Sequence, residues 1–253
     1  NKNKMATLKE TFQERVKAYG CKNEDLAVNY FTRLDNELKK SSPAKQWKEV
    51  GFDDFLAKSI AYANIGIDPL APKMLSFTLF KNKSTLLFDI VFVEDVRCME
   101  LLARRFGVNC PENITVELIY STDVFSMIKK DLSHPSEGYV LEVSNPFNRG
   151  EIIGGVSLME YENPAYNKVR IMSMADITKR VKTTDYSGKE TSFWKNFKPE
   201  MCEKTIGKNA WSKVVLNTTE LSEYYALKPS EEAKEDFEPE STTDLPFNPD
   251  AEL

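Results

Sequence analysis

The stretch "MLSFTLFKNKSTLLFDIVFVEDVRCMELLARRFG" (Met74–Gly107) decides the fold, because the spacing of its apolar residues changes within it. Two short runs rich in aromatic and β-branched residues, "MLSFTLF" and "TLLFDIVFV", are separated by the polar "KNKS", which is typical of a β-hairpin. Residues 94–106 then place apolar side chains three and four positions apart, and Gly107 follows them. This spacing predicts a helix that ends at a glycine cap. Its expected buried residues are Val96, Met99, Ala103 and Phe106.

The sequence on either side of this stretch predicts helices before it and further strands after it. Apolar residues recur at helical spacing in three segments of residues 5–66, two of which end at Gly20 and Gly66. Four later runs read as strands, "NITVELIYS", "YVLEVS", "EIIGGVSLMEYE" and "KVRIMSM", and the pair Gly154–Gly155 in the third predicts a bulge or close backbone packing. A short helix, "ADITKRVK", and a last helix with Pro199 in its first turn follow. We therefore expect an α+β fold: a helical N-terminal part, a central and mostly antiparallel sheet with packed helices, and a C-terminal helix.

The composition is that of a globular protein in a reducing compartment. The 253 residues are 41% hydrophobic and contain no apolar run of about 18 residues, so we expect a packed core and no membrane contact. Residues 1–20 are polar and charged, unlike a signal peptide. Four cysteines without a CxxC pair and a single histidine, His134, do not favour disulfides or a structural zinc site. We expect the protein in the cytoplasm.

Charge is divided unevenly along the chain. The formal net charge is −5, but residues 230–253 hold nine acids and one base, which leaves 30 acids and 33 bases in residues 1–229. The acidic segment is rich in Glu, Pro and Ser, and this composition predicts disorder from Leu227 onward. Three roles remain open for it: a solubilising tail, a competitor of DNA for a basic groove, or a segment that recruits a partner. The last role would use "TTDLPF" (Thr242–Phe247), which is similar to the acidic tip of bacterial single-strand binding proteins.

The sequence contains none of the common catalytic motifs. There is no GxxxxGK[ST] phosphate loop and no GxGxxG turn, so a function on DNA is expected to be independent of ATP. His134 lies in "DLSHPSEG" without a nearby GxSxG. The paired acids Asp53–Asp54 and Glu94–Asp95 stand at helix starts, where capping explains them. We expect no catalytic residue, no metal and no cofactor, and a two-metal nuclease built on scattered acids remains an alternative.

Basic residues gather in three stretches, of which the clearest is "FWKNFKPEMCEKTIGKNAWSK" (Phe193–Lys213), with five lysines. Placed on a helix, this stretch and the next residue turn one apolar face inward, made of Cys202, Ile206, Ala210 and Val214. The adjacent stripe holds Lys204, Lys208, Trp211 and Val215. Lysines beside an indole suit single-stranded DNA, with cations for phosphates and a ring for an unstacked base. A core tryptophan beside solvated lysines remains the alternative, and helix-dipole interactions remain one for the arginines of residues 94–106.

Four motifs occur in an order that resembles a known family. They are "ANIGIDPL" (Ala63–Leu70), "CMELLARRFG" (Cys98–Gly107), "VRIMSMADITKRVK" (Val169–Lys182) and "FWKNFKPEMCEKTIGKNAWSKVV" (Phe193–Val215). Together they resemble the phage RecT-type single-strand annealing proteins of the RecT and Red-beta superfamily. The matched residues are Arg104 and Arg105 in the family's "ARR", Lys204 in its "KT", Lys208 as the first arginine of its "RR", and Trp194 at or near the aromatic residue before its "EM". Asn209 stands where the family has the second arginine.

The resemblance implies ATP-independent annealing of complementary DNA strands in phage recombination, without catalysis. It implies a homo-oligomer, a ring or a helical filament, whose basic groove holds single-stranded DNA and then the annealed duplex intermediate. The further partners that it implies are a phage exonuclease and the host single-strand binding protein, in the bacterial cytoplasm. A passive single-strand binding or replication accessory protein is the alternative function.

These expectations assign parts of the chain to roles. Residues 1–51 are expected to form an N-terminal helical region with oligomer contacts, residues 52–226 the annealing core, and residues 227–253 the acidic tail. The expected nucleic-acid-binding residues are Arg97, Arg104, Arg105, Lys179, Arg180, Trp194, Lys195, Lys204, Lys208 and Trp211. The basic residues of this set would contact phosphates, and one of the two tryptophans would stack on a base.

Overall fold

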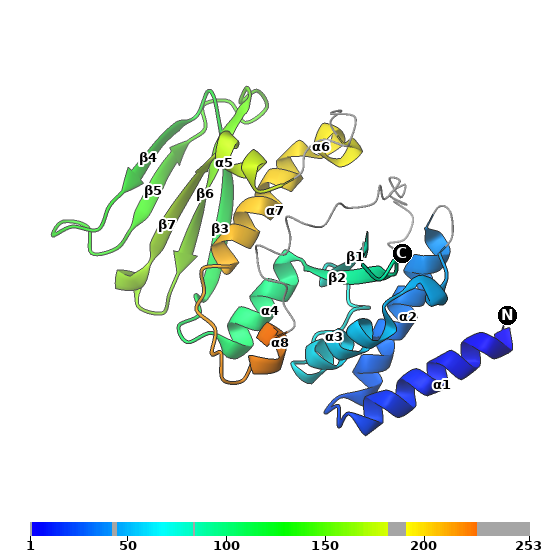
Figure 1. Cartoon of the computed structure of the whole chain (residues 1–253). Helices are drawn as coiled ribbons and strands as arrows, with labels where there is room; N and C mark the ends of the chain where they lie inside the picture. Colours follow the sequence, from blue (N-terminus) through cyan, green and yellow to red (C-terminus); the bar gives the residue numbers. More distant parts are fainter. Residues whose placement is uncertain (1, 42–44, 83, 182–190, 227–253) are drawn as a thin grey trace. The chain divides into compact units, whose positions relative to one another are not determined.

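The computed structural model combines helices with antiparallel strands, so the predicted α+β fold class is confirmed (Figure 1). The residues that it describes are 2–41, 45–82, 84–181 and 191–226. The predicted acidic tail from Leu227 onward lies outside the described residues. Among the helices of the described ranges, none has the length and apolar character of a membrane span.

The chain divides into two compact units. In the described ranges, the first unit comprises residues up to 98 together with 218–226, and the second unit comprises residues 99–217. The strands of the described chain form three small sheets, β1-β2, β3-β6-β7 and β4-β5, whose neighbouring strands are all antiparallel. The predicted antiparallel pairing is therefore confirmed, although the strands are not joined into one central sheet.

Three long helices of the first unit confirm the helical N-terminal part. They are α1 (Lys2–Ala18), α2 (Glu24–Lys40) and α3 (Phe52–Asn64). Gly20 and Gly66 follow α1 and α3 with φ angles of +68° and +78°, which only glycine adopts at little cost. Both helices thus end where the sequence predicts a glycine stop.

Aromatic side chains fill the core of the first unit. Phe12 of α1 is fully buried, with ring centroids 5.4 Å from Phe31 of α2 and 6.0 Å from Phe55 of α3. A short 3₁₀ helix, η1 (Trp47–Glu49), adds Trp47, whose ring stacks on Phe31 at 4.3 Å. These tightly packed rings explain the helical spacing of the apolar residues, because each helix turns one aromatic stripe toward the others.

The predicted hairpin is confirmed in the first unit. Strands β1 (Leu75–Lys81) and β2 (Phe88–Glu94) pair antiparallel over their full length. On one face Phe77 and Phe92 lie opposite each other in the register, with stacked rings 4.6 Å apart. This cross-strand aromatic pair stabilises the two-stranded sheet.

A short helix that the sequence analysis missed, α8 (Ser222–Ala226), returns to the first unit. The hydroxyl of Tyr224 on α8 donates to Glu94 Oε1, and the hydroxyl of Tyr62 on α3 donates to the same oxygen at 2.8 Å. Both tyrosines are buried. Burial first, and then the Glu94 carboxylate, raise the pKa of both hydroxyls, so they stay protonated donors. Glu94 therefore fastens the segment after the second unit to α3.

The helix α4 (Val96–Phe106) has a buried face that differs from the predicted one. Ala103 is buried as predicted, but the other buried residues are Cys98 and Leu102, while Val96, Met99 and Phe106 are half-buried. The buried Cys98 and Leu102 lie four residues apart, each one position before a residue of the predicted stripe, and a cysteine side chain packs as a small apolar residue. Asp95 accepts a hydrogen bond from the backbone N–H of Val96 at 2.7 Å, as predicted for an acid at the helix start.

The second unit contains a three-stranded sheet with strand order β3-β6-β7. Its strands are β3 (Asn113–Tyr120), β6 (Ile152–Glu160) and β7 (Lys168–Ser173). A separate hairpin of β4 (Val124–Ile128) and β5 (Gly138–Glu142) lies between β3 and β6 in the chain. Strand β4 was not predicted from the sequence, whereas the other four strands were.

Each face of this sheet is covered by a different element. On one face Leu118 and Met172 pack against Cys202 and Ile206 of α7 (Lys198–Trp211). On the other face the buried residues are Ile119, Val156 and Val169, which pack against apolar residues of the β4-β5 hairpin. The alternation of side chains along each strand supplies both faces.

Helix α7 confirms the predicted last helix and its inward face. Pro199 lies in its first turn, and the predicted inward residues Cys202, Ile206 and Ala210 are buried, together with Val214 beyond its end. A Cβ atom on Gly155 of β6 would lie 2.4 Å from Ile206 Cδ1. A Cβ atom on Gly154 would lie 2.4 Å from the backbone oxygen of Met172, and one on Gly155 would lie 2.9 Å from the backbone oxygen of Glu117. These contacts confirm the predicted close backbone packing at this pair.

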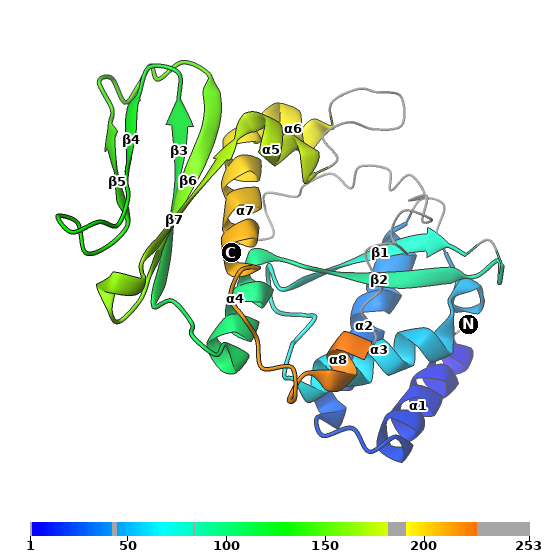
Figure 2. The same cartoon turned by 60° about the vertical axis from the view of Figure 1, so that its left-hand side comes forward.

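Three short elements complete the second unit. They are η2 (Pro164–Tyr166) before β7, α5 (Met174–Lys179) directly after β7, and α6 (Ser192–Asn196) before α7. The short helix predicted from "ADITKRVK" is thus confirmed as α5. Figure 2 shows β7, α5 and α7 as neighbours.

Candidate nucleic-acid interface

A groove of about 520 Å³ lies between β7, α5 and α7 in the second unit. Its charged and polar residues, which we call the basic groove, are Arg170, Asp176, Lys179, Arg180, Asn209 and Lys213. Val169, Ile171 and Met172 of β7 complete the lining. The groove thus presents four cations and one carboxylate beside an edge strand.

The local structure places each of these side chains. Met172 is buried against α7, and because side chains alternate along β7, Arg170 stands on the same face. Ser173 begins α5 with a capping box, in which its Oγ accepts from the N–H of Asp176 at 3.1 Å while Asp176 Oδ2 accepts from the N–H of Ser173 at 3.1 Å. Ile177 of α5 is buried, so the helix is anchored with the basic residues that follow it on the surface.

The charges of the basic groove are exposed and mostly uncompensated. Asp176 is the one carboxylate, and its hydrogen bonds from Ser173 hold its pKa below the usual range. In the described part of the chain, no ion pair involves any of its four cations, Arg170, Lys179, Arg180 and Lys213. Because these cations face water, their attraction for an anion is expected to be strongly screened by salt.

Asn209 adds a polar atom without a partner to the groove. Its Nδ2 is buried and makes no hydrogen bond to any described residue. An unsatisfied buried donor costs about 1–3 kcal/mol, so a ligand oxygen or a water that accepts from it is favoured. An asparagine beside arginines and lysines suits phosphate oxygens, which only accept hydrogen bonds.

Two of the predicted nucleic-acid-binding residues, Lys179 and Arg180, line the basic groove. The remaining predicted cations do not line it. On the surface of the described chain Arg97, Arg104, Arg105, Lys195 and Lys204 are exposed, and Lys208 is half-buried. A role for these residues in DNA binding stays a prediction.

Arg104 is engaged by its own unit. Its Nε donates to Glu100 at 2.8 Å, and one of its terminal nitrogens donates to the backbone oxygen of Glu112 at 3.2 Å. The guanidinium also lies over the ring of Trp211, 5.5 Å from the ring centre. These contacts use the Nε–H, one terminal N–H and one face of the guanidinium, so a phosphate would have to share Arg104 with them.

Both tryptophans proposed for stacking are buried. Trp194 is 2% exposed in the cluster that includes Met172 and Cys202, and Trp211 is 7% exposed beneath Arg104. In this conformation neither indole offers a free ring face to a base. Their burial corresponds to the alternative interpretation, a core tryptophan beside solvated lysines.

Three groove residues were missed in the sequence analysis: Arg170, Asn209 and Lys213. Arg170 stands in the quoted motif "VRIMSM", and its signal was the two-residue period of the strand, which places it on the face of Met172. Asn209 and Lys213 lie one helical turn apart, and their signal was this spacing at the end of α7. Neither signal alone reveals that the strand and the helix line one groove.

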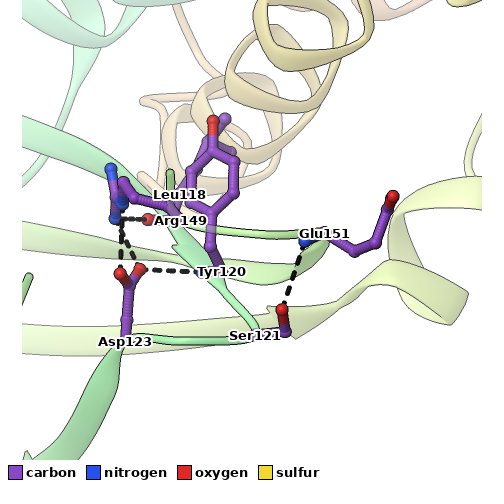
Figure 3. Close-up of polar contacts among 6 residues, drawn as sticks. All are labelled: Leu118, Tyr120, Ser121, Asp123, Arg149 and Glu151. Carbon is purple, nitrogen blue, oxygen red and sulfur yellow. Dashed lines mark hydrogen bonds and ion pairs between the residues drawn. The ribbon is translucent and has the colours of Figure 1, made fainter. Parts of the chain in front are cut away.

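A second polar cluster, at the end of β3, holds an arginine in a structural role (Figure 3). Arg149 donates to the Asp123 carboxylate at 2.6 and 3.1 Å and to the backbone oxygen of Leu118 at 2.9 Å. Asp123 also accepts from the N–H of Tyr120 at 2.8 Å, and Arg149 lies 4.2 Å from the centre of the Tyr120 ring. The hydrogen bond from Arg149 first, and the backbone N–H of Tyr120, hold the pKa of Asp123 below its usual range. This network holds the segment before β6 against the end of β3.

Groups suited to catalysis are scattered in the described residues. His134 Nδ1 lies 3.1 Å from Asp131 on the surface, where the backbone N–H groups of His134 and Ser133 hold the pKa of Asp131 below its usual range. The described residues contain no cluster of three or more His, Cys, Asp or Glu side chains that could hold a metal ion. The described chain therefore offers no such starting point for a two-metal site.

Comparison with known proteins identifies the family. The family model described as the RecT family matches residues 70–244, which include the whole second unit and the basic groove. No curated protein sequence and no solved structure gave a match. Since the match covers more than half of the chain, this protein belongs to the RecT family, DNA-binding proteins that anneal single strands in recombination.

Proposed function

We propose that the basic groove binds the phosphates of single-stranded DNA, and that the protein anneals this strand to its complement without ATP. The observation that carries the proposal is the gathering of four unpaired cations, Arg170, Lys179, Arg180 and Lys213, in one groove of the described chain. Membership of the RecT family supports strand annealing as the reaction, and the groove is the proposed binding site of the strand.

The chemistry of the groove suits annealing. Contacts to phosphates position a strand without reading its sequence, so the base edges stay available to a complementary strand. Phosphate contacts alone give binding that falls steeply with salt. Annealing breaks no covalent bond. This accords with a non-catalytic protein that does not need ATP.

A single groove covers few nucleotides, and therefore we propose that several copies act together as a ring or a helical filament. The oligomer would hold one strand along successive grooves and release the annealed duplex intermediate. A phage exonuclease that exposes single strands, and the host single-strand binding protein that covers them, are the proposed partners in the bacterial cytoplasm.

An annealing assay with two complementary oligonucleotides tests the proposal. We expect the wild-type protein to accelerate annealing without ATP, and Arg170→Ala/Lys213→Ala to slow annealing by about tenfold at low salt, because two phosphate contacts are lost. The matched control is Lys9→Ala/Lys17→Ala, which removes two exposed lysines from α1 and, once gel filtration shows an unchanged oligomeric state, should anneal as the wild type does.

The same assay separates the alternatives. Binding without faster annealing would reduce the protein to a passive single-strand binding protein. Strand cleavage after addition of Mg²⁺ would contradict a non-catalytic annealing role. Equal losses in the groove variant and the α1 control would remove the basic groove from the proposal.

A further inference from the structure

Strand β7 is an edge strand that runs along the basic groove. In the described chain its one strand partner is β6, with an unbroken antiparallel register from Gly154↔Ser173 to Met159↔Lys168. In such a register every second residue turns its backbone N–H and C=O away from the partner strand. Those outward groups of β7 that no other part of the chain binds are therefore open to a ligand in the groove.

Two of these outward N–H groups already bind carboxylates of the same chain. The N–H of Val169 donates to Glu137 Oε2 at 3.0 Å, and the N–H of Ser173 donates to Asp176 Oδ2 at 3.1 Å. These bonds also show which alternate residues of β7 turn their backbone groups outward, because both donors point away from β6. Ile171 lies between them and has the same orientation.

Ile171 is the open position of this edge. Its side chain is 48% exposed, and in the described part of the chain its outward N–H and C=O have no hydrogen-bond partner. A phosphate can accept from the N–H but has no donor for the C=O. An extended peptide supplies both an acceptor and a donor, as in the addition of a strand to a sheet edge.

We propose that the acidic segment of this chain, residues 230–253, binds as an extended peptide on the β7 edge at Ile171, with its carboxylates in the basic groove. The segment carries nine acids and one base, and the groove carries four cations and one carboxylate that already caps α5. The two carboxylates bound at Val169 and Ser173 show that this edge accepts acidic side chains.

The proposal rests on the proposed function for its consequence, since the same cations would bind DNA. The acidic segment would then compete with DNA for the groove and raise the concentration of DNA needed for binding. The competition is reversible. It weakens with salt, because the cations of the basic groove are exposed and their attraction for carboxylates is screened. A segment bound this way would occupy the groove until DNA displaces it.

The first test compares the full chain with a full-length variant in which the nine acids of residues 230–253 are replaced by their amides. Because the competitor is lost, we expect this variant to bind single-stranded oligo-dT roughly three- to tenfold more tightly at low salt, with the difference lost at high salt. A second full-length variant, with residues 230–253 in shuffled order, keeps their net charge. It tests whether competition with DNA depends on the order of these residues as well as on their charge. Equal affinity of the wild type and the amide variant would overturn the competition.

The second test does not involve DNA. The synthetic peptide 230–253 is added to the amide variant, and hydrogen exchange is measured in the fragment that contains β7. We expect the peptide to slow exchange in this fragment, at Ile171 in particular, and the amide form of the peptide to have no effect. Unchanged exchange would overturn the docking.

The two tests keep the proposals apart. If neither the wild type nor the amide variant binds DNA, the proposed function fails, while protection of β7 by the peptide still supports docking. If the amide variant binds DNA more tightly but the peptide leaves β7 unprotected, diffuse repulsion by the acidic segment explains the effect and the docking proposal fails.

Discussion

The two units use their charged groups in opposite ways. In the first unit Glu94 is enclosed by hydroxyls of the buried residues Tyr62 and Tyr224, so its charge holds α8 to α3. In the second unit Arg170 and Lys213 stand exposed in a groove. A half-buried carboxylate that accepts hydrogen bonds from buried hydroxyls contributes to the stability of the fold, whereas exposed charges of one sign cost little stability and remain available to a ligand. Changes at the two places should therefore affect different properties.

The largest expected effect is on the stability of the first unit. Glu94→Ala leaves the buried hydroxyls of Tyr62 and Tyr224 without their acceptor, which should lower the free energy of unfolding by about 2–4 kcal/mol. Chemical denaturation measures this loss. Tyr224→Phe is the milder variant, because it removes one donor and leaves the carboxylate bound by Tyr62.

The second unit provides the contrast for this experiment. Arg170→Ala/Lys213→Ala should change the free energy of unfolding by less than about 1 kcal/mol, because both side chains are exposed. A loss as large as that of Glu94→Ala would contradict the division between a structural charge and a ligand-binding charge.

A smaller effect is expected at Asp123, the one described carboxylate that Arg149 binds. Its pKa is held below the usual range in the folded state, so its contribution to stability is complete above its unfolded pKa of about 3.9 and is lost as the pH falls toward the lower folded value. Asp123→Asn should therefore be destabilised relative to the wild type at pH 7, and the gap should narrow near pH 3. Urea unfolding at both pH values measures it, and a gap that widens in acid would contradict the assignment.

The smallest expected effect sharpens the role of the groove. Asn209→Arg adds a cation to the basic groove, and should tighten binding of single-stranded DNA by about two- to fivefold at low salt. Asn209→Ala is the control that removes the amide without adding charge. Fluorescence anisotropy with a labelled oligonucleotide measures both, and equal affinities would place position 209 outside the DNA path.

Much of the fold could be predicted because local spacing decides it. The hairpin β1-β2, the three N-terminal helices and the inward face of α7 each follow from a period of two or about 3.6 residues. Strand β4 and helix α8 were missed because they owe their formation to contacts outside themselves, β4 to its pairing with β5 and α8 to the contact of Tyr224 with Glu94. The buried face of α4 differed because apolar residues stand at neighbouring positions, Leu102 beside Ala103 and Cys98 beside Met99, and their spacing alone does not decide which of them faces the core.

The candidate site was harder to predict for the same reason. Lys179 and Arg180 were found because they follow each other in a basic run, but Arg170 and Lys213 reach the groove from a strand and a helix more than forty residues apart in the chain. Trp211 was chosen for its lysine neighbours and Trp194 for its place in the family motif, but Trp194 is buried in the cluster with Leu118 and Met172, and Trp211 is buried beneath Arg104. Which side of an amphipathic helix meets solvent depends on the element that covers it.

The central claim, that the basic groove binds DNA phosphates, is tested most directly by the salt dependence of binding. The logarithm of the affinity for single-stranded oligo-dT is measured against the logarithm of the salt concentration for the wild type, Arg170→Ala/Lys213→Ala and the α1 control Lys9→Ala/Lys17→Ala. Since each phosphate contact to a single strand contributes a slope of about −0.7, the groove variant should lose about 1.4 from the slope while the α1 control keeps it. A groove variant with the wild-type slope would contradict the claim.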